Sequence, residues 1–351
     1  MKIIKTKDAS VDEIVTVLKK GGLVIYPTET VYGVGVDATN SDAIKKLNLY
    51  KKRPFGKPYS IAVSDEKMAK RYVFINETAK NLYKNFLPGP MTVISKGKGR
   101  VAKGVESEDG TLGIRIPNYV LVVDIVKKLG SPITATSANA SYKKRPYKIT
   151  DILDNISANQ KKLLDLIIDA GTLPPREPST VVDTTSEDNI VLRQGDIKLK
   201  SRNQVRTFSP EATQNIAKEL WQKYEKHHKN RAIVFALKGK MGTGKTVFTK
   251  GLAKALGIKD IVTSPTYNLE QDYGNGKLHH IDVWRLRSVA ELRDLEIDKY
   301  IRQKSVIAIE WADKITDAVR PMHEDAVVLW VEILYGIKNE ERIIYWGIEK
   351  G

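Results

Sequence analysis

The sequence predicts two α/β domains joined in one chain. Its 351 residues exceed the roughly 100–200 residues of one ordinary domain. Short strand-like and helix-like segments alternate through the first part, and a glycine-rich loop lies between an apolar strand and a helix in the second. Residues 196–204 are polar and show no period longer than a turn, which is typical of a linker. We therefore expect a first domain at 1–200, a linker at 201–206 and a second domain at 207–351.

The first domain is expected to be a mixed α/β domain built from short elements. Residues 23–27 form an apolar run that predicts a buried strand ending at Pro27. Residues 41–49 predict a helix with Ser41 as its N-cap. Further segments of the same mixed set lie at 60–63, 111–116, 132–136, 163–168 and 180–183.

The second domain is expected to begin with a helix. Ser209 followed by Pro210 is a typical helix start, and the helix should run to about Tyr224. Residues 232–237 predict a fully apolar strand that leads into the glycine-rich loop, and 306–309 predict a second buried strand. This succession of strand, loop and helix indicates a second α/β domain.

Composition places the chain among ordinary globular proteins. Hydrophobic residues make up 41% and charged residues 28%, which excludes a mostly disordered or collagen-like chain. The absence of cysteine excludes disulfides, thiolate zinc sites, iron–sulfur clusters and a cysteine nucleophile. No stretch approaches the ~20 apolar residues of a membrane span, and residues 1–5 lack the features of a signal peptide. We therefore expect a cytoplasmic protein without membrane association.

The chain carries a formal net charge of +16, of which +11 lies within residues 1–200. Positive charge on this scale favours anionic ligands such as nucleotides, tRNA or an acidic partner. Because the lysines are scattered rather than gathered in one run, a solvated lysine-rich surface explains the charge equally well. Charge alone leaves both interpretations open.

The strongest motif is a phosphate-binding loop. Residues 239–246 match G-x-x-x-x-G-K-[ST] at every fixed position. Glycines let successive backbone N–H groups face one anion, and the positive end of the following helix adds to the attraction. Lys245 is expected to reach the β/γ-phosphates of ATP, and Thr246 to offer its hydroxyl to Mg²⁺. A chance glycine-rich turn does not account for the flanking strand and helix. The ATP-binding residues predicted here are Gly239, Met241, Gly242, Thr243, Gly244, Lys245 and Thr246.

Two carboxylates follow strand-like segments downstream of the loop. Asp282 comes after a short strand, and Glu310 ends an apolar strand. In a P-loop fold, an acid at such a strand end can approach Mg²⁺ from the side opposite Thr246. The alternatives are a salt bridge between Asp282 and Arg285, and a solvated carboxylate at Glu310. We expect ordinary packing or surface roles for the two histidines at 279–280.

From about residue 207 to 351, the chain resembles the TsaE family of small P-loop ATPases, which act in the synthesis of tRNA threonylcarbamoyladenosine. The order and spacing of the motifs fit across the whole segment. The family usually has a tyrosine in place of Trp284, a change that keeps an aromatic side chain. The matching segments are 239–246, 264–269, 280–285 and 309–311.

This resemblance assigns roles to residues of the second domain. It implies that Thr246 and Glu310 hold Mg²⁺ and that Asp282 is the hydrolysis residue. It also implies a nucleotide-responsive switch at residues 264–267. Thr213 is expected near the nucleotide base.

Polar side chains gather at predicted strand ends of the first domain. Residues 27–33 form a turn rich in hydroxyls, and Lys51 and Arg53 come just after the predicted helix. Arg115 lies in an alternating strand, and residues 137–139 place a hydroxyl and an amide where a strand ends. Each of these features alone is more typical of an ordinary turn or a solvated basic residue than of a binding site. Their combination favours a binding site.

Over about residues 5–200, the chain resembles the YrdC/TsaC family of threonylcarbamoyl-AMP synthases. The family is marked by K-x-R followed much later by S-x-N, found here at 51–53 and 137–139. Some members have a histidine beside threonine where this chain has Ala62, so that contact is absent or supplied otherwise. The resemblance implies an open twisted α/β sheet with a deep basic cavity. Companion segments that also match are 27–33, 111–117, 179–183 and 192–195.

The resemblance further implies a reaction that joins L-threonine, bicarbonate or CO₂, and ATP into threonylcarbamoyl-AMP with release of pyrophosphate. Lys51 and Arg53 are the implied catalytic residues, because they can neutralise the triphosphate. The residues suited to threonine are Thr30, Arg115, Thr136 and Ser179. The residues suited to ATP in this domain are Lys51, Arg53, Lys57, Thr111, Ser137, Asn139 and Arg193.

Together, the two resemblances predict a fusion of two enzymes of one tRNA-modification pathway, with ATP as substrate at both sites and Mg²⁺ as cofactor. The second domain would serve a separate TsaD-type transferase with a TsaB-type subunit, and tRNA would be the final acceptor. An alternative is an RNA-binding regulatory protein in which the P-loop ATPase acts as a switch. A carbamoyl-transfer module of the hydrogenase-maturation type would carry zinc-finger cysteines, and the chain has none.

Overall fold

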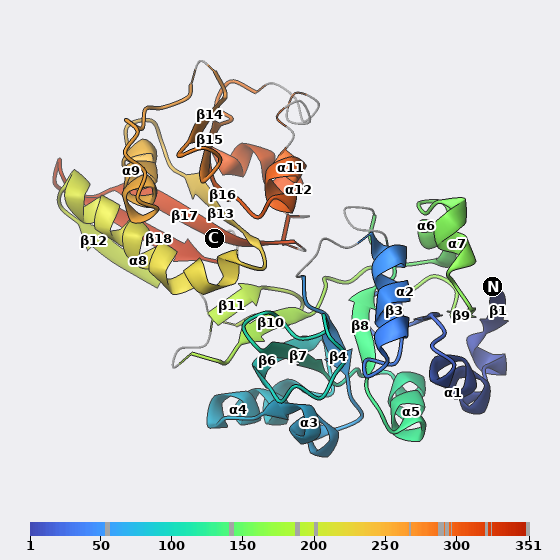
Figure 1. The fold of residues 1–351 in the computed structure, drawn as a ribbon. Coiled ribbons are helices and arrows are strands. Elements are labelled where there is room, and N and C mark those ends of the chain that lie inside the picture. Colours follow the sequence, from blue (N-terminus) through green and yellow to red (C-terminus); the bar gives the residue numbers. More distant parts are fainter. Residues whose placement is uncertain are drawn as a thin grey trace. The chain divides into compact units, whose positions relative to one another are not determined.

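The computed structural model divides the chain into two compact units, residues 1–199 and 200–351 (Figure 1). Within the described part of the chain, no helix combines the length and the apolar character needed to cross a membrane. The described residues are 1–52, 57–139, 144–186, 190–199, 203–266, 268–286, 291, 295, 297–319, 322–323 and 325–348.

The first unit is built on a mixed sheet with the strand order β1-β9-β2-β3-β8-β4-β7-β6-β10-β11, in which β5 also pairs with β6. Parallel pairs such as β4 with β7 stand beside antiparallel pairs such as β3 with β8. The strands are β1 (Lys2–Lys5), β2 (Val24–Tyr26), β3 (Gly33–Gly35), β4 (Ser60–Ala62), β5 (Val73–Phe74), β6 (Met91–Gly97), β7 (Thr111–Arg115), β8 (Ile133–Ser137), β9 (Leu166–Asp169), β10 (Thr180–Asp183) and β11 (Ile190–Arg193).

Helices and an apolar core complete the first unit. A cluster of buried apolar side chains includes residues from Ile14 to Val182, and burial of such surface supplies most of the folding free energy. The helices are η1 (Thr6–Asp8), α1 (Val11–Lys19), α2 (Ser41–Lys51), α3 (Glu66–Tyr72), α4 (Glu77–Phe86), α5 (Val120–Leu129), α6 (Ile149–Leu153) and α7 (Ala158–Lys162).

The start of helix α2 differs from the prediction. The N-cap is Asn40 rather than Ser41, because Asn40 Oδ1 accepts hydrogen bonds from the N–H groups of Asp42 and Ala43, each at 3.0 Å. Both asparagine and serine are good N-cap residues, so the two adjacent candidates cannot be separated by residue type. The helix runs two residues beyond the predicted end and closes at Lys51.

The second unit is built on a sheet with the strand order β12-β18-β17-β13-β16-β15-β14. Strand β13 is parallel to both β16 and β17, and β15 is parallel to β16. The mixed α/β fold predicted for the chain is thereby confirmed. The strands are β12 (Asn203–Thr207), β13 (Ala232–Lys238), β14 (Glu270–Tyr273), β15 (Leu278–Asp282), β16 (Val306–Glu310), β17 (Ala326–Tyr335) and β18 (Arg342–Gly347).

Both faces of strand β13 are covered, which explains why its sequence is apolar without alternation. Ala232 and Val234 belong to a cluster with side chains of the two helices α11 (Ile297–Arg302) and α12 (Thr316–Val319). On the other face, Phe235 packs against Phe248, with ring centroids 5.8 Å apart. The 3₁₀ helix η2 (Ala312–Ile315) precedes α12.

Two long helices, α8 (Pro210–His228) and α9 (Lys245–Ala255), pack side by side in the second unit (Figure 1). The predicted helix start at Ser209 is confirmed, since Ser209 Oγ accepts from Ala212 N at 3.1 Å, and the helix continues past the predicted end near Tyr224 to His228. The helices approach so closely that a Cβ on Gly251 would lie 2.4 Å from the carbonyl oxygen of Gln214. Glycine is therefore required at this crossing.

The predicted linker at 201–206 is wrong for residues 203–206, which belong to strand β12. This strand pairs antiparallel with β18, with Gln204 opposite Tyr345. It is an edge strand, and four of its five residues are exposed or half-buried. Because an edge strand with little buried surface needs few apolar residues, its polar sequence is indistinguishable from a linker.

Candidate functional site

The phosphate loop of the second unit lies between strand β13 and helix α9, as predicted. Gly242 and Gly244 adopt left-handed backbone angles, with φ of 76° and 107°, which favour glycine. A Cβ on Gly239 would lie 2.4 Å from the carbonyl oxygen of Ile333. The loop glycines are thus required by backbone conformation and by the close approach of β17.

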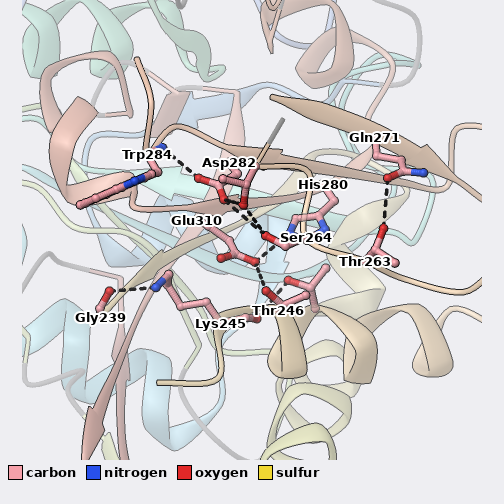
Figure 2. A network of polar contacts seen from close by, with 12 residues as sticks. Gly239, Lys245, Thr246, Thr263, Ser264, Gln271, His280, Asp282, Trp284 and Glu310 are labelled. Atoms are coloured by element: carbon pink, nitrogen blue, oxygen red, sulfur yellow. Dashed lines mark hydrogen bonds and ion pairs between the residues drawn. The ribbon is translucent and has the colours of Figure 1, made fainter. Parts of the chain in front are cut away.

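Lys245 is folded back onto this loop. Its Nζ donates a hydrogen bond to the carbonyl oxygen of Gly239 at 2.9 Å (Figure 2). It also donates to the carbonyl oxygen of Lys240 at 2.9 Å and lies 3.8 Å from the ring centroid of Trp311. The residue is only 4% exposed, and burial lowers the pKa of its ammonium group. A phosphate anion in the loop would compensate this buried positive charge.

The two predicted carboxylates lie at the same end of the sheet. In the parallel pairing of β15 and β16, Asp282 stands directly opposite Glu310. Thr246 Oγ1 donates to Glu310 Oε1 at 2.8 Å (Figure 2). Glu310 is 3% exposed, so the alternative of a solvated carboxylate is wrong.

Asp282 accepts hydrogen bonds from residues 264 and 266 of the segment predicted to act as a switch. Its Oδ2 accepts from Thr266 Oγ1 at 2.9 Å, with Ser264 Oγ at 3.4 Å. Its Oδ1 accepts from the backbone N–H of Trp284 at 2.8 Å (Figure 2). Tyr267, the last residue of the predicted switch, lies outside the described residues.

His280 is a site residue that sequence reasoning missed. Its Nε2 lies 2.9 Å from Glu310 Oε1 (Figure 2), and the residue is 0% exposed. The signal was its spacing, because residues i and i+2 of a strand share one face, which places His280 on the face of Asp282. His279, on the other face, stacks on Tyr300 with ring centroids 3.7 Å apart.

The phosphate loop, Asp282 and Glu310 line a cavity of about 250 Å³. Trp284 and Trp311 form an aromatic wall, with ring centroids 4.3 Å apart. Thr243, which is also predicted as an ATP-binding residue, supports the loop by donating its hydroxyl to the Lys240 carbonyl at 2.9 Å. The hydroxyl of Thr213, the residue expected near the nucleotide base, shares a 2.9 Å hydrogen bond with the hydroxyl of Thr207. Thr213 does not line the cavity. The lining residues are Met241, Gly242, Gly244, Lys245, Thr246, Val247, Ser264, Thr266, Asp282, Trp284, Glu310 and Trp311.

The donor chemistry of this cavity fits Mg²⁺. Thr246 and Glu310 offer a hydroxyl and a carboxylate that already lie within hydrogen-bond distance of each other. Among the described residues, no three acidic, histidine or cysteine side chains form an all-protein metal cage. Mg²⁺ is usually held by one or two carboxylates together with substrate phosphates rather than by such a cage.

In the first unit, the turn after β2 meets the end of β7. Arg115 Nη2 donates to Glu29 Oε1 at 2.7 Å and to Thr30 Oγ1 at 2.9 Å. Arg115 Nε and Glu29 Oε2 are buried without a hydrogen-bond partner. Thr28 Oγ1 donates to the Val31 carbonyl at 2.7 Å and so shapes the turn. Glu29 is a second residue missed from the sequence, since its role depends on facing Arg115.

Ser179 and Arg193 form a second group in this unit. The guanidinium of Arg193 donates to Ser179 O at 2.9 Å and to Ser179 Oγ at 3.0 Å. The Ser179 hydroxyl also lies 3.0 Å from Thr92 Oγ1. The structure thus brings together one residue predicted for threonine and one predicted for ATP.

Lys51 joins the end of α2 to the end of β8. It is 3% exposed, and its Nζ donates to the carbonyl oxygens of Ser137, at 2.8 Å, and Asn139. The second basic residue of this motif, Arg53, lies outside the described residues.

The remaining candidates of the first unit lie on neighbouring strands or beside them. Thr136 pairs with Val34 between β8 and β3, and Thr111 Oγ1 lies 2.8 Å from Ser107 Oγ. Lys57 is half-buried. Ala62, which replaces the family histidine, stands beside Arg115 in the pairing of β4 with β7.

Comparison with known protein families gives one match in the first unit and another in the second unit. The family model Sua5/YciO/YrdC, described as "Telomere recombination", matches residues 16–195. The model TsaE, described as "Threonylcarbamoyl adenosine biosynthesis protein TsaE", matches residues 207–343.

Relatives and solved structures agree with the first match. A putative threonylcarbamoyl-AMP synthase of Methanocaldococcus jannaschii is 35% identical over 57% of this chain and 95% of its own length. The threonylcarbamoyl-AMP synthase of Bacillus subtilis is 32% identical over 55% of this chain and 56% of its own length. The crystal structure of P. abyssi Sua5 complexed with L-threonine matches with a TM-score of 0.55 at 20% identity, over 94% of this chain and 100% of that one. At this identity the last match shows the fold alone. The chain therefore belongs to the Sua5/YciO/YrdC family, and its second unit carries a TsaE domain.

Proposed function

We propose that this chain is a bifunctional protein of tRNA threonylcarbamoyladenosine biosynthesis. Its first unit would make L-threonylcarbamoyl-AMP from L-threonine, bicarbonate or CO₂, and ATP, with release of pyrophosphate. Its second unit would hydrolyse ATP to support a TsaD-type transferase with a TsaB-type subunit, and tRNA would be the final acceptor. The names of the relatives and the match to TsaE support the pathway.

The observation that carries the synthase proposal is the buried group around Arg115. Its guanidinium keeps one N–H without a partner, and Glu29 keeps one oxygen without a partner. Leaving a buried polar atom unsatisfied costs roughly 1–3 kcal/mol, so a ligand that pairs with both atoms gains affinity. An α-amino acid carries the required carboxylate and ammonium. The Thr30 and Ser179 hydroxyls are suited to a substrate that itself bears a hydroxyl group.

The proposed reaction demands positioning and charge neutralisation. The threonine amine attacks the carbon of CO₂ and gives up a proton, or attacks the carbon of bicarbonate with loss of water, to form a carbamate. The carbamate oxygen then attacks the α-phosphorus of ATP, and the bond to pyrophosphate breaks. Lys51 and Arg53 would neutralise the triphosphate in this step. The nucleotide would be held by Lys57, Thr111, Ser137, Asn139 and Arg193.

The observation that supports the ATPase proposal is the cavity lined by the phosphate loop, with Asp282 and Glu310 opposite. Lys245 would turn from the loop carbonyls to the β/γ-phosphates. Thr246 and Glu310 would hold Mg²⁺, which when bound would neutralise charge on those phosphates. Asp282 would orient the attacking water while Thr266 and Ser264 report the state of the nucleotide.

The test of the proposed function is detection of threonylcarbamoyl-AMP by mass spectrometry after incubation with ATP, threonine and bicarbonate. Pyrophosphate should appear only when threonine and bicarbonate are both present. ATP turnover that is indifferent to threonine, with no acyl adenylate formed, would instead favour an RNA-binding regulatory protein with an ATPase switch.

A further inference from the structure

A buried histidine lies within hydrogen-bond distance of the proposed metal site of the second unit. His280 lies in strand β15 and is 0% exposed. Its Nε2 lies 2.9 Å from Glu310 Oε1, the same oxygen that accepts from Thr246 Oγ1 at 2.8 Å (Figure 2). Two donors from two different elements therefore hold one carboxylate oxygen.

This arrangement leaves the second carboxylate oxygen of Glu310 available. Figure 2 shows Oε1 at the meeting point of the two contacts and Oε2 directed away from them. Because Glu310 lines the 250 Å³ cavity, the contact with His280 restricts how the carboxylate can rotate beside the phosphate loop. A carboxylate held by one oxygen presents the other in one orientation.

The hydrogen bond to Glu310 decides which ring nitrogen of His280 is the donor. A carboxylate oxygen can only accept, so Nε2 of His280 must carry the proton of this hydrogen bond. Nδ1 is buried without a hydrogen-bond partner, and an N–H at that position would be left unpaired. The hydrogen bonds therefore favour a tautomer with the proton on Nε2.

A packing role alone does not account for this choice of residue. The adjacent His279 also lies in β15, but it faces the other side, where it stacks on Tyr300 and lies 3.3 Å from Glu270. An apolar side chain at position 280 would avoid the unpartnered Nδ1, at the loss of the contact to Glu310. In the structure, position 280 has both the unpartnered Nδ1 and the contact to Glu310, so the contact accounts for a histidine there.

We propose that His280 is a positioning residue, which holds Glu310 so that its carboxylate receives the Mg²⁺ of the bound nucleotide. The proposal rests on the ATPase function proposed above. It assigns His280 no contact with the nucleotide or with the reacting atoms.

Two nearly isosteric substitutions test this role in the full-length chain. The amide nitrogen of glutamine can occupy the place of histidine Nε2, whereas that of asparagine corresponds to Nδ1. We therefore expect His280→Gln to retain the contact to Glu310 and His280→Asn to lose it. The adjacent substitution His279→Asn controls for the loss of a buried histidine from the same strand.

The measurement is calorimetric binding of a non-hydrolysable ATP analogue at increasing Mg²⁺ concentration, together with binding in EDTA. Loss of a residue that orients a metal ligand typically costs about 10–100-fold in metal affinity. His280→Asn should therefore raise the half-saturating Mg²⁺ concentration by about tenfold or more, with affinity in EDTA changed by less than about twofold. His280→Gln and His279→Asn should stay close to the unmodified protein.

The outcomes separate this inference from the proposed function. If the unmodified protein binds the analogue equally well with and without Mg²⁺, the ATPase proposal fails. If its binding depends on Mg²⁺ and His280→Asn shows the same dependence, the positioning role is wrong. Equal losses in His280→Asn and His280→Gln, or a loss in EDTA, would also overturn it, because these results indicate a structural role. Thermal unfolding of each variant verifies that the binding data come from folded protein.

Discussion

The two units build their candidate sites in opposite ways. In the second unit, residues 239–246 form one continuous loop that presents backbone groups to an anion. In the first unit, the corresponding side chains come from the turn after β2, the ends of β7 and β11, and the residue before β10. Hydrogen bonds join these segments in two pairs, Arg115 with Thr30 and Arg193 with Ser179, although the members of each pair are not adjacent in the sequence. A site built from backbone can be recognised locally, whereas a site built from strand ends depends on the topology of the sheet.

The largest expected effect comes from Lys245→Ala in the second unit. Removal of this lysine eliminates the main side-chain contact to the β/γ-phosphates. We expect multiple-turnover tRNA modification to stop when the transferase partners are supplied, with synthesis of threonylcarbamoyl-AMP unchanged. A paired assay, with mass spectrometry of the intermediate and of modified tRNA, measures both effects.

Two outcomes of the Lys245→Ala experiment would contradict the proposal that the two units work as separate sites of one pathway. Loss of intermediate synthesis in a folded variant would mean that the two sites are coupled. Full multiple-turnover modification would mean that the second unit does not serve the transferase.

A substitution in the first unit should give the opposite pattern. Lys51→Ala removes a buried cation from the proposed triphosphate site, and loss of one such stabilising group typically costs about 10²–10³-fold in rate. We expect threonylcarbamoyl-AMP synthesis to fall by at least about 100-fold, with ATP hydrolysis by the second unit unchanged. The adjacent Lys52→Ala is the matched control, because Lys52 is exposed and follows the helix as its C-cap. Equal synthesis by both variants would remove Lys51 from the site.

The sequence predicted the continuous loop of the second unit better than the site of the first unit, which is built from strand ends. The phosphate loop, Asp282 and Glu310 were predicted because each lies at a strand end recognisable from local pattern. His280 was missed, because its contact with Glu310 depends on the register of β15 against β16. In the first unit the candidate residues were named individually or through the family resemblance, but their grouping required the three-dimensional fold. Glu29 was missed, because nothing local indicates that it meets Arg115.

The fold shows a similar limit. Apolar strands such as β13 were predicted well, since burial on both faces leaves a continuous apolar run. Strand β12 was assigned to a linker because an edge strand exposes most of its side chains. The pattern of apolar residues therefore indicates which strands are buried, and an exposed strand lacks that pattern.

A smaller and more selective effect is expected from Arg115→Lys. Lysine retains the positive charge but loses the planar pair of donors that matches a carboxylate. We expect the KM for threonine to rise by about tenfold or more, with the KM for ATP changed little. Steady-state kinetics with each substrate varied in turn distinguishes these parameters. A rise in the KM for ATP alone would place Arg115 in the nucleotide site instead.

The smallest expected effect concerns stability and separates the observed helix cap from the predicted one. Asn40 accepts two backbone N–H groups at the start of α2, the helix that ends at Lys51. Replacing an N-cap by alanine typically costs about 1 kcal/mol, or about fivefold in an opening equilibrium. Asn40→Ala should therefore increase hydrogen exchange in peptides covering α2 by about fivefold, and Ser41→Ala should leave it nearly unchanged. Peptides covering α9 in the second unit should not respond to either substitution. A stronger response to Ser41→Ala would restore the predicted cap, and a response in α9 would show that the two units share their folding stability.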